Sequence, residues 1–189
     1  MHFFRLLILA SLSLYLRAQT SPLPLKAVLV LPKELCVQKV VSGNLWSGKE
    51  TFDFGARFCP AVQQMLATSF TSYETRATLP APGQVTTGLV LQTKLIDADV
   101  TRTMTAFGKR HMLVLVEWKI TSPQGNLVWI QTVEGKMEQT SGNMYTFRKN
   151  QRKLFAGVIA DLIQNSQLAI TSAPELRQRG TSRPTVQQE

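Results

Sequence analysis

The sequence is poor in the residues on which most catalytic sites depend. Its 189 residues include two histidines and two cysteines, and only 17% are Asp, Glu, Lys or Arg. Two histidines leave little material for a zinc centre or a histidine-based catalytic set. The Cys-x-x-Cys spacing of redox pairs, the Gly-x-Ser-x-Gly elbow and the glycine motifs of phosphate and dinucleotide sites are all absent. We therefore expect a protein that is not an enzyme and that holds no metal or cofactor.

The titratable residues that remain form no recognisable catalytic set. His111 lies beside two basic residues at the start of a predicted strand, with no nucleophile motif to accompany it. Asp97 and Asp99 could share one face of a strand, but neither an EF-hand pattern nor a third acid follows them. Glu117 and Glu134 could serve carboxylate-only glycosidase chemistry, although nothing distinguishes them from surface charges. A small secreted hydrolase is therefore the least favoured alternative.

Only the beginning of the chain carries a long apolar run. A short basic segment, 1–5, precedes the run 6–16, and Ala18 follows before a polar stretch. This layout predicts a cleaved secretory signal over residues 1–18, because the run is shorter than the roughly 20 residues that span a bilayer. We expect a periplasmic or otherwise extracytoplasmic location, a single domain over 19–172, and a disordered tail over 173–189, where polar residues and prolines predominate.

The two cysteines are Cys36 and Cys59. An even number of cysteines in an exported chain favours a disulfide, because the compartment is oxidising. The alternatives are two free buried thiols or, less favoured because the spacing is wrong, a redox pair.

The hydrophobic pattern predicts five strands and two helices in a chain that is 44% hydrophobic. The expected strands are 26–31, 73–79, 87–96, 112–120 and 127–133; the helices are 56–72 and 147–170; and 33–55 is a long loop. Trp118 and Trp129 belong to a predicted hairpin and could share one sheet face. The element order predicts an α+β fold: a two-layer sandwich of a mainly antiparallel four- to five-stranded sheet with two amphipathic helices on one face.

Positive charge exceeds negative charge by nine. Four basic residues crowd the start of the second predicted helix, where the helix dipole disfavours cations, and two more precede the predicted hairpin: Arg148, Lys149, Arg152, Lys153, Lys109 and Arg110. An anion docked there would be stabilised by these charges. The alternative is a solvated face that only improves solubility. Export disfavours nucleic acid as the partner.

Four local phrases resemble a group of small bacterial envelope proteins. They are 55–70, Val114–Ile120, 125–129 and 152–162, within a likeness that covers 26–170. The group includes the lipopolysaccharide-assembly lipoprotein of the outer-membrane translocon and auxiliary components of envelope transport systems. Members are commonly lipid-anchored through a cysteine at the signal cut, which this chain lacks. The resemblance implies an accessory or binding role without chemistry.

The function expected from the sequence is that of an exported, non-enzymatic envelope accessory protein. It would bind an anionic lipid or an envelope transport or assembly complex, with peripheral association to the membrane, and the six basic residues are the expected contacts. The alternative is a protein–protein adaptor that docks through an exposed edge of its sheet.

Overall fold

The computed structural model describes residues 22–44, 48–102, 109–140 and 147–181, so the predicted signal, 1–18, lies outside the described residues. A five-stranded sheet with the order β4-β1-β5-β6-β7 forms the centre of the fold. Its strands are β1 (Leu23–Val30), β4 (Phe70–Arg76), β5 (Leu89–Arg102), β6 (Lys109–Thr121) and β7 (Leu127–Thr140). These correspond to the five strands that the sequence predicts.

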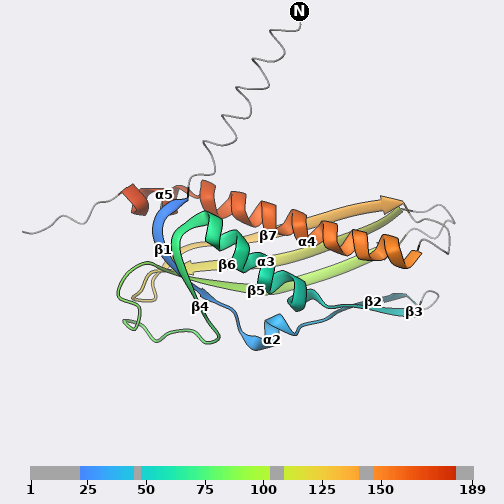
Figure 1. The fold of residues 1–189 in the computed structure, drawn as a ribbon, viewed down its shortest axis with the longest axis horizontal. Helices are drawn as coiled ribbons and strands as arrows, with labels where there is room; N and C mark the ends of the chain where they lie inside the picture. The colour runs from blue at the N-terminus through green and yellow to red at the C-terminus, as the bar shows by residue number, and fades with distance from the viewer. Residues whose placement is uncertain (1–21, 45–47, 103–108, 141–146, 182–189) are drawn as a thin grey trace, which may run out of the picture.

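The sheet is mixed. β5, β6 and β7 form two long antiparallel ladders, whereas β1 pairs in parallel with both β4 and β5. β1 pairs with only the first residues of β5, Leu89–Gln92, so the rest of β5 continues past it toward the far end of the molecule (Figure 1). The expectation of a mainly antiparallel sheet is confirmed for the long strands and is incomplete for β1 and β4.

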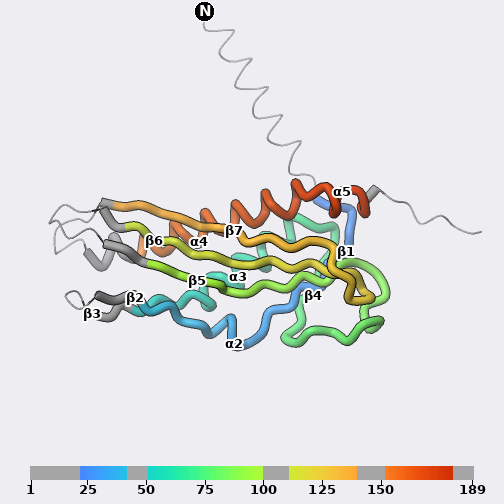
Figure 2. Tube along the Cα trace, turned by 180° about the vertical axis from the view of Figure 1, so that it is seen from behind, coloured from blue at the N-terminus to red at the C-terminus, as the bar shows by residue number. Residues whose placement is uncertain are grey.

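Two long helices, α3 (Phe54–Ser69) and α4 (Phe147–Ser172), lie on the same face of the sheet (Figure 1). Seen from behind, the long strands lie in front of them and their rear face is uncovered by helices (Figure 2). The core forms between the helices and the sheet, and it includes Val62 and Leu66 from α3 and Val158 and Leu162 from α4. α3 begins two residues before the predicted start, so Pro60 lies in its second turn rather than its first. Pro60 leaves the Ala56 carbonyl without its helical hydrogen bond, and Ala56 is exposed, so water can take the place of the missing donor.

The segment predicted as one long loop contains a short helix and a hairpin. α2 (Lys33–Cys36) is followed by β2 (Val40–Asn44) and β3 (Gly48–Phe52), which form a separate two-stranded sheet. The hairpin lies beside the far half of β5 in both views (Figures 1 and 2). Its base is anchored by Val40, which is buried, and by Phe52, whose ring centroid lies 5.1 Å from that of Phe155 in α4. Few apolar residues are needed for this anchoring, which explains why no hydrophobic period marks the segment.

The tail over 173–189 was expected to be disordered. The structure corrects this expectation for residues 174–181, and 182–189 lie outside the described residues. α5 (Pro174–Thr181) continues from α4 and contacts β1. Leu176 is fully buried, Ala173 is almost so, and the Arg177 Nε donates a 2.7 Å hydrogen bond to the Thr171 carbonyl. One buried leucine in a polar segment is enough to dock a short helix, and composition alone does not reveal it.

Other differences concern the bounds of strands. β4 starts three residues before its predicted start because Phe70, which caps α3, is already extended. β5 and β7 extend to Arg102 and Thr140, past their predicted ends at residues 96 and 133. Pairing with β6 supplies both extensions with backbone hydrogen bonds, so they need no apolar alternation of their own.

The predicted disulfide is confirmed. Cys36 at the end of α2 is bonded to Cys59 in α3, with Cα atoms 5.7 Å apart. Gly55 lies at the same junction, where an added Cβ would lie 2.0 Å from the Leu35 carbonyl oxygen and 2.4 Å from the Cys36 carbonyl carbon. Only glycine therefore allows α2 and the start of α3 to approach this closely.

Two glycines at the contact between α4 and β7 should respond differently to alanine. A Cβ on Gly135 would lie 2.5 Å from the Leu162 Cβ and 2.7 Å from the Val158 carbonyl oxygen, neither of which can move without displacing α4. A Cβ on Gly157 would meet only the flexible end of Met137, at 3.1 Å. We expect Gly135→Ala to lower the free energy of unfolding by about 1–3 kcal/mol through overpacking. Gly157→Ala should leave it unchanged or raise it by up to about 1 kcal/mol through helix propensity.

Chemical denaturation of both variants tests this contrast. Each variant adds one methyl group at the same helix–strand contact, so the comparison isolates whether the neighbouring atoms can move. Equal changes in the denaturation midpoint would contradict it.

Within the part of the chain that the structure describes, no helix is both long enough and apolar enough to cross a membrane.

Candidate binding surface at the basic end

The fold brings the predicted basic residues to one end of the molecule. β6 begins at Lys109 and α4 begins at Phe147, and both of these ends lie at the far end from α5 (Figure 1). Lys109 and Arg110 are thus the first residues of β6, and Arg148 and Lys149 lie in the first turn of α4; the placement of these four side chains lies outside what the structure describes. Arg152 and Lys153 follow in α4 and are exposed. The binding role of the six residues stays a prediction.

A further arginine joins this end through the register of the sheet. Arg102, the last residue of β5, pairs with Arg110 in the antiparallel ladder. The register therefore places a second arginine position next to Arg110 at this end of the sheet, although the placement of both side chains lies outside what the structure describes. Sequence analysis did not single out Arg102, because only the pairing of the strands shows that it lies next to Arg110.

Arg57 of α3 is the second basic residue that the sequence analysis missed. Its Cζ lies 5.9 Å from the centre of the Phe155 ring, within the range of a cation–π contact. Phe155 lies one turn after Arg152 on α4, so Arg57 reaches the basic start of α4 from the neighbouring helix. No spacing along the chain links Arg57 to residues almost a hundred positions later, and only the packing of α3 against α4 does so.

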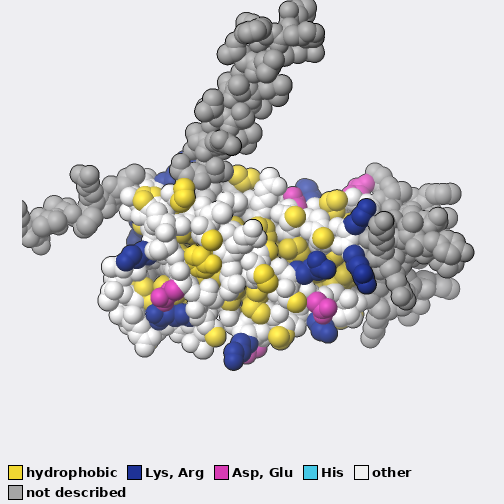
Figure 3. All heavy atoms as spheres, in the orientation of Figure 1, with side chains coloured by type: hydrophobic (Ala, Val, Ile, Leu, Met, Phe, Trp, Pro, Cys, Tyr) yellow, Lys and Arg dark blue, Asp and Glu magenta, His cyan; other side chains and the backbone are white. Residues whose placement is uncertain are grey.

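Arg57, Arg152 and Lys153 form what we call the basic patch. Figure 3 shows dark blue side chains gathered on the helix-covered face at this end of the molecule. All three residues are exposed, and none forms an ion pair with another described residue. By contrast, the exposed Lys39 nearby is paired with Asp53 at 3.4 Å. The positive charge of the patch is therefore available to an external anion.

The other titratable candidates do not converge on a site. His111 is exposed and its Nδ1 lies 3.3 Å from the Glu138 carboxylate on β7. The Asp97 carboxylate accepts a hydrogen bond from the adjacent Ala98 backbone N–H, and Asp99 is likewise exposed. Among the described residues, no group of three or more His, Cys, Asp or Glu side chains is placed to hold a metal ion.

The sequence matches no protein-family model and no curated protein. The fold is similar to that of a Xanthomonas campestris protein of the family DUF330, with 7% identity, a TM-score of 0.51 and coverage of 85% of this chain and 91% of that one. A homologue of the neuraminyllactose-binding haemagglutinin from Helicobacter pylori gives 8% identity, a TM-score of 0.50 and coverage of 86% and 92%. A minor lipoprotein of Acinetobacter baumannii gives 14% identity, a TM-score of 0.49 and coverage of 80% of this chain and 93% of that one.

All three similar structures come from bacteria, and the Acinetobacter baumannii protein is named a lipoprotein. At these identities the likeness establishes the fold alone. The narrower assignment, to the lipopolysaccharide-assembly type or to transport auxiliary proteins, stays a prediction from the sequence.

Proposed function

We propose that this protein is an exported, non-catalytic accessory protein of a bacterial cell envelope that binds an anionic membrane component at its basic end. The observation that carries the proposal is the convergence of Arg57, Arg152 and Lys153 on one exposed surface with no acidic partner among the described residues. The pairing of Arg102 with Arg110 adds positive charge at the same end.

Export is supported by two independent features. The leader-like segment 1–18 has the layout of a cleaved signal. The Cys36–Cys59 bond is of a kind that forms and persists in oxidising compartments outside the cytoplasm. The protein then contacts the membrane from its extracytoplasmic side, and its association with that membrane is peripheral.

The proposed ligand group is a phosphate or carboxylate on a lipid headgroup. The basic patch lies beside the N-terminal turns of α4, where the helix dipole favours an anion. Each Lys or Arg near an anionic membrane surface contributes about 1 kcal/mol to binding. Three such residues together contribute about 3 kcal/mol to binding at an anionic membrane surface.

Sedimentation with lipid vesicles tests the proposal. We expect the protein to bind vesicles that contain anionic phospholipid and to leave purely zwitterionic vesicles unbound. The triple variant Arg57→Glu, Arg152→Glu and Lys153→Glu should bind the anionic vesicles about 100-fold more weakly, since it loses about 1 kcal/mol per residue. Binding should also weaken as the salt concentration rises, because the contacts are exposed.

A matched control reverses the same number of charges elsewhere. Lys33, Lys94 and Lys119 are exposed, and none belongs to the basic patch. Their substitution by Glu changes the net charge equally, so it should leave most of the vesicle binding intact. The proposal is wrong if both triple variants lose binding to the same extent, because net charge would then explain the result. Unchanged binding in the variant of the basic patch would also contradict it.

A further inference from the structure

The two edge strands of the main sheet, β7 and β4, differ in whether side chains hydrogen-bond their outward backbone groups. On β7, the Lys136 backbone N–H donates a 2.8 Å hydrogen bond to the Asp161 carboxylate of α4. The Asn165 side-chain amide of α4 donates at 2.9 Å to the Glu134 carbonyl oxygen. Two α4 side chains therefore occupy backbone groups that would otherwise pair with another strand, and this edge is blocked.

The opposite edge, β4, has no such block. The Arg76 carbonyl accepts a hydrogen bond from Leu31, so it points toward β1, and the alternation of a strand turns the backbone groups of Thr71, Tyr73 and Thr75 outward. Among the described residues, no side chain caps these outward groups. The strand itself contains no proline or lysine, which are common protections of an edge.

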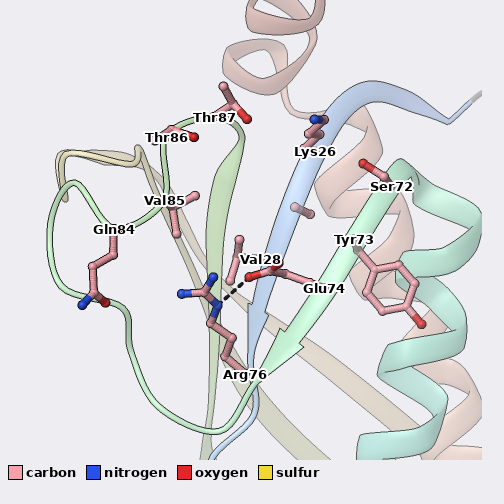
Figure 4. Close-up of a pocket in the computed structure, with 11 residues that line it drawn as sticks. Lys26, Val28, Ser72, Tyr73, Glu74, Arg76, Gln84, Val85, Thr86 and Thr87 are labelled. Carbon is pink, nitrogen blue, oxygen red and sulfur yellow. Dashed lines mark hydrogen bonds and ion pairs between the residues drawn. The ribbon is translucent and has the colours of Figure 1, made fainter.

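A pocket of about 390 Å³ lies over β1 and this edge strand, under the loop that follows β4 (Figure 4). Its walls include Lys26 of β1, Ser72, Glu74 and Arg76 of β4, and two threonines of the loop that follows β4. The pocket is on the sheet face opposite the helices, where the loop packs over Val28 through Val85. Gly88 allows this loop to return against β1, since its φ is +104° and a Cβ would lie 2.6 Å from the Lys26 carbonyl oxygen.

The charges of the pocket leave one cation uncompensated. Glu74 and Arg76 form an ion pair with each other, as the dashed line in Figure 4 marks. Lys26 is exposed and forms no ion pair with a described residue. It pairs with Ser72 in the parallel register, so it lies two strand spacings, about 10 Å, from a strand added beside β4. A lysine and a glutamate side chain can together bridge that distance.

We propose that β4 and the adjacent pocket form a docking site for an extended, acidic segment of a protein partner. The segment adds to the sheet as a sixth strand beside β4, with hydrogen bonds to the outward backbone groups of Thr71, Tyr73 and Thr75. Alternate side chains of the segment face the pocket, and an acidic one pairs with Lys26. Main-chain bonds supply affinity in this mode, and the pocket supplies specificity.

The test uses three heptapeptides in which threonine alternates with glutamate, glutamine or lysine, titrated into isotopically labelled protein and followed by NMR. We expect the glutamate peptide to shift the amide signals of β4 and to bind about tenfold more tightly than the lysine peptide. Lys26→Glu should reverse this preference. Thr75→Pro should abolish binding of all three peptides, because it removes an outward N–H while sparing the bonds to β1. Thr75→Val keeps that N–H and is the matched control.

Several results would overturn the proposal. It fails if no peptide moves the β4 signals, or if Thr75→Pro binds as Thr75→Val does while both remain folded by their amide spectra. If the β4 signals instead depend on protein concentration without peptide, a second copy of the chain occupies the edge. Vesicle binding should be the same in Lys26→Glu and in the unchanged protein, and its loss would mean that Lys26 serves the membrane instead.

Discussion

Substitution of Trp118 by alanine should lower the free energy of unfolding by about 3–5 kcal/mol, the range for deleting a large aromatic side chain from a core. Trp118 is fully buried in the middle of β6, and its indole N–H donates a 2.9 Å hydrogen bond to the Ser166 hydroxyl of α4. The side chain therefore joins the sheet to the helix layer by both packing and a polar contact. Chemical denaturation, followed by circular dichroism, measures the loss.

Two further variants separate these contributions. Ser166→Ala leaves the buried indole N–H without a partner and should cost about 1–3 kcal/mol. Trp118→Phe keeps an aromatic ring but removes the donor. If the hydrogen bond matters, the double variant should be more stable than the sum of the two single effects predicts, since no unpaired N–H remains. Exact additivity would contradict a contribution from the hydrogen bond and attribute the effect of Trp118 to packing.

The central hairpin shows what a sequence can predict. Every second residue of β6 from Met112 to Ile120 is apolar, and the structure places these five residues in the core: Met112, Val114, Val116, Trp118 and Ile120. Trp129 pairs with Ile120 and so shares the face of Trp118, as expected. In a strand with one buried face, apolar residues recur at every second position, and in a helix with one buried face they recur every three to four positions. The fold class and the two main helices could therefore be predicted from these periods.

The sequence analysis did not predict α5 or the β2–β3 hairpin. Each of them buries few residues, so neither shows a hydrophobic period. α5 docks mainly through Leu176, and the β2–β3 hairpin through residues at its base. The candidate surface was incomplete for a different reason. Arg148–Lys153 is a charge run visible in the chain, whereas Arg57 and Arg102 join it only through helix packing and strand register. Contacts between distant segments leave no local trace in a single sequence.

Removal of the disulfide, by Cys36→Ser together with Cys59→Ser, should lower the free energy of unfolding by about 3.4 kcal/mol in the chain-entropy model. The bond closes the segment that carries α2 and the β2–β3 hairpin, with a sequence separation of 23. This segment has few other anchors, so its detachment in the folded protein should add to the effect. The double variant avoids leaving one reactive free thiol.

The unchanged protein under reducing conditions is the matched control, because it loses the same bond without a change in sequence. Its denaturation midpoint should fall to that of the double variant, and its intact mass should rise by about two hydrogens on reduction. Faster proteolysis within 33–55 than elsewhere would locate the loosened segment at the hairpin. If reduction left both the mass and the midpoint unchanged, the two cysteines would be unbonded thiols, and the oxidising location that supports export would lose one of its two observations.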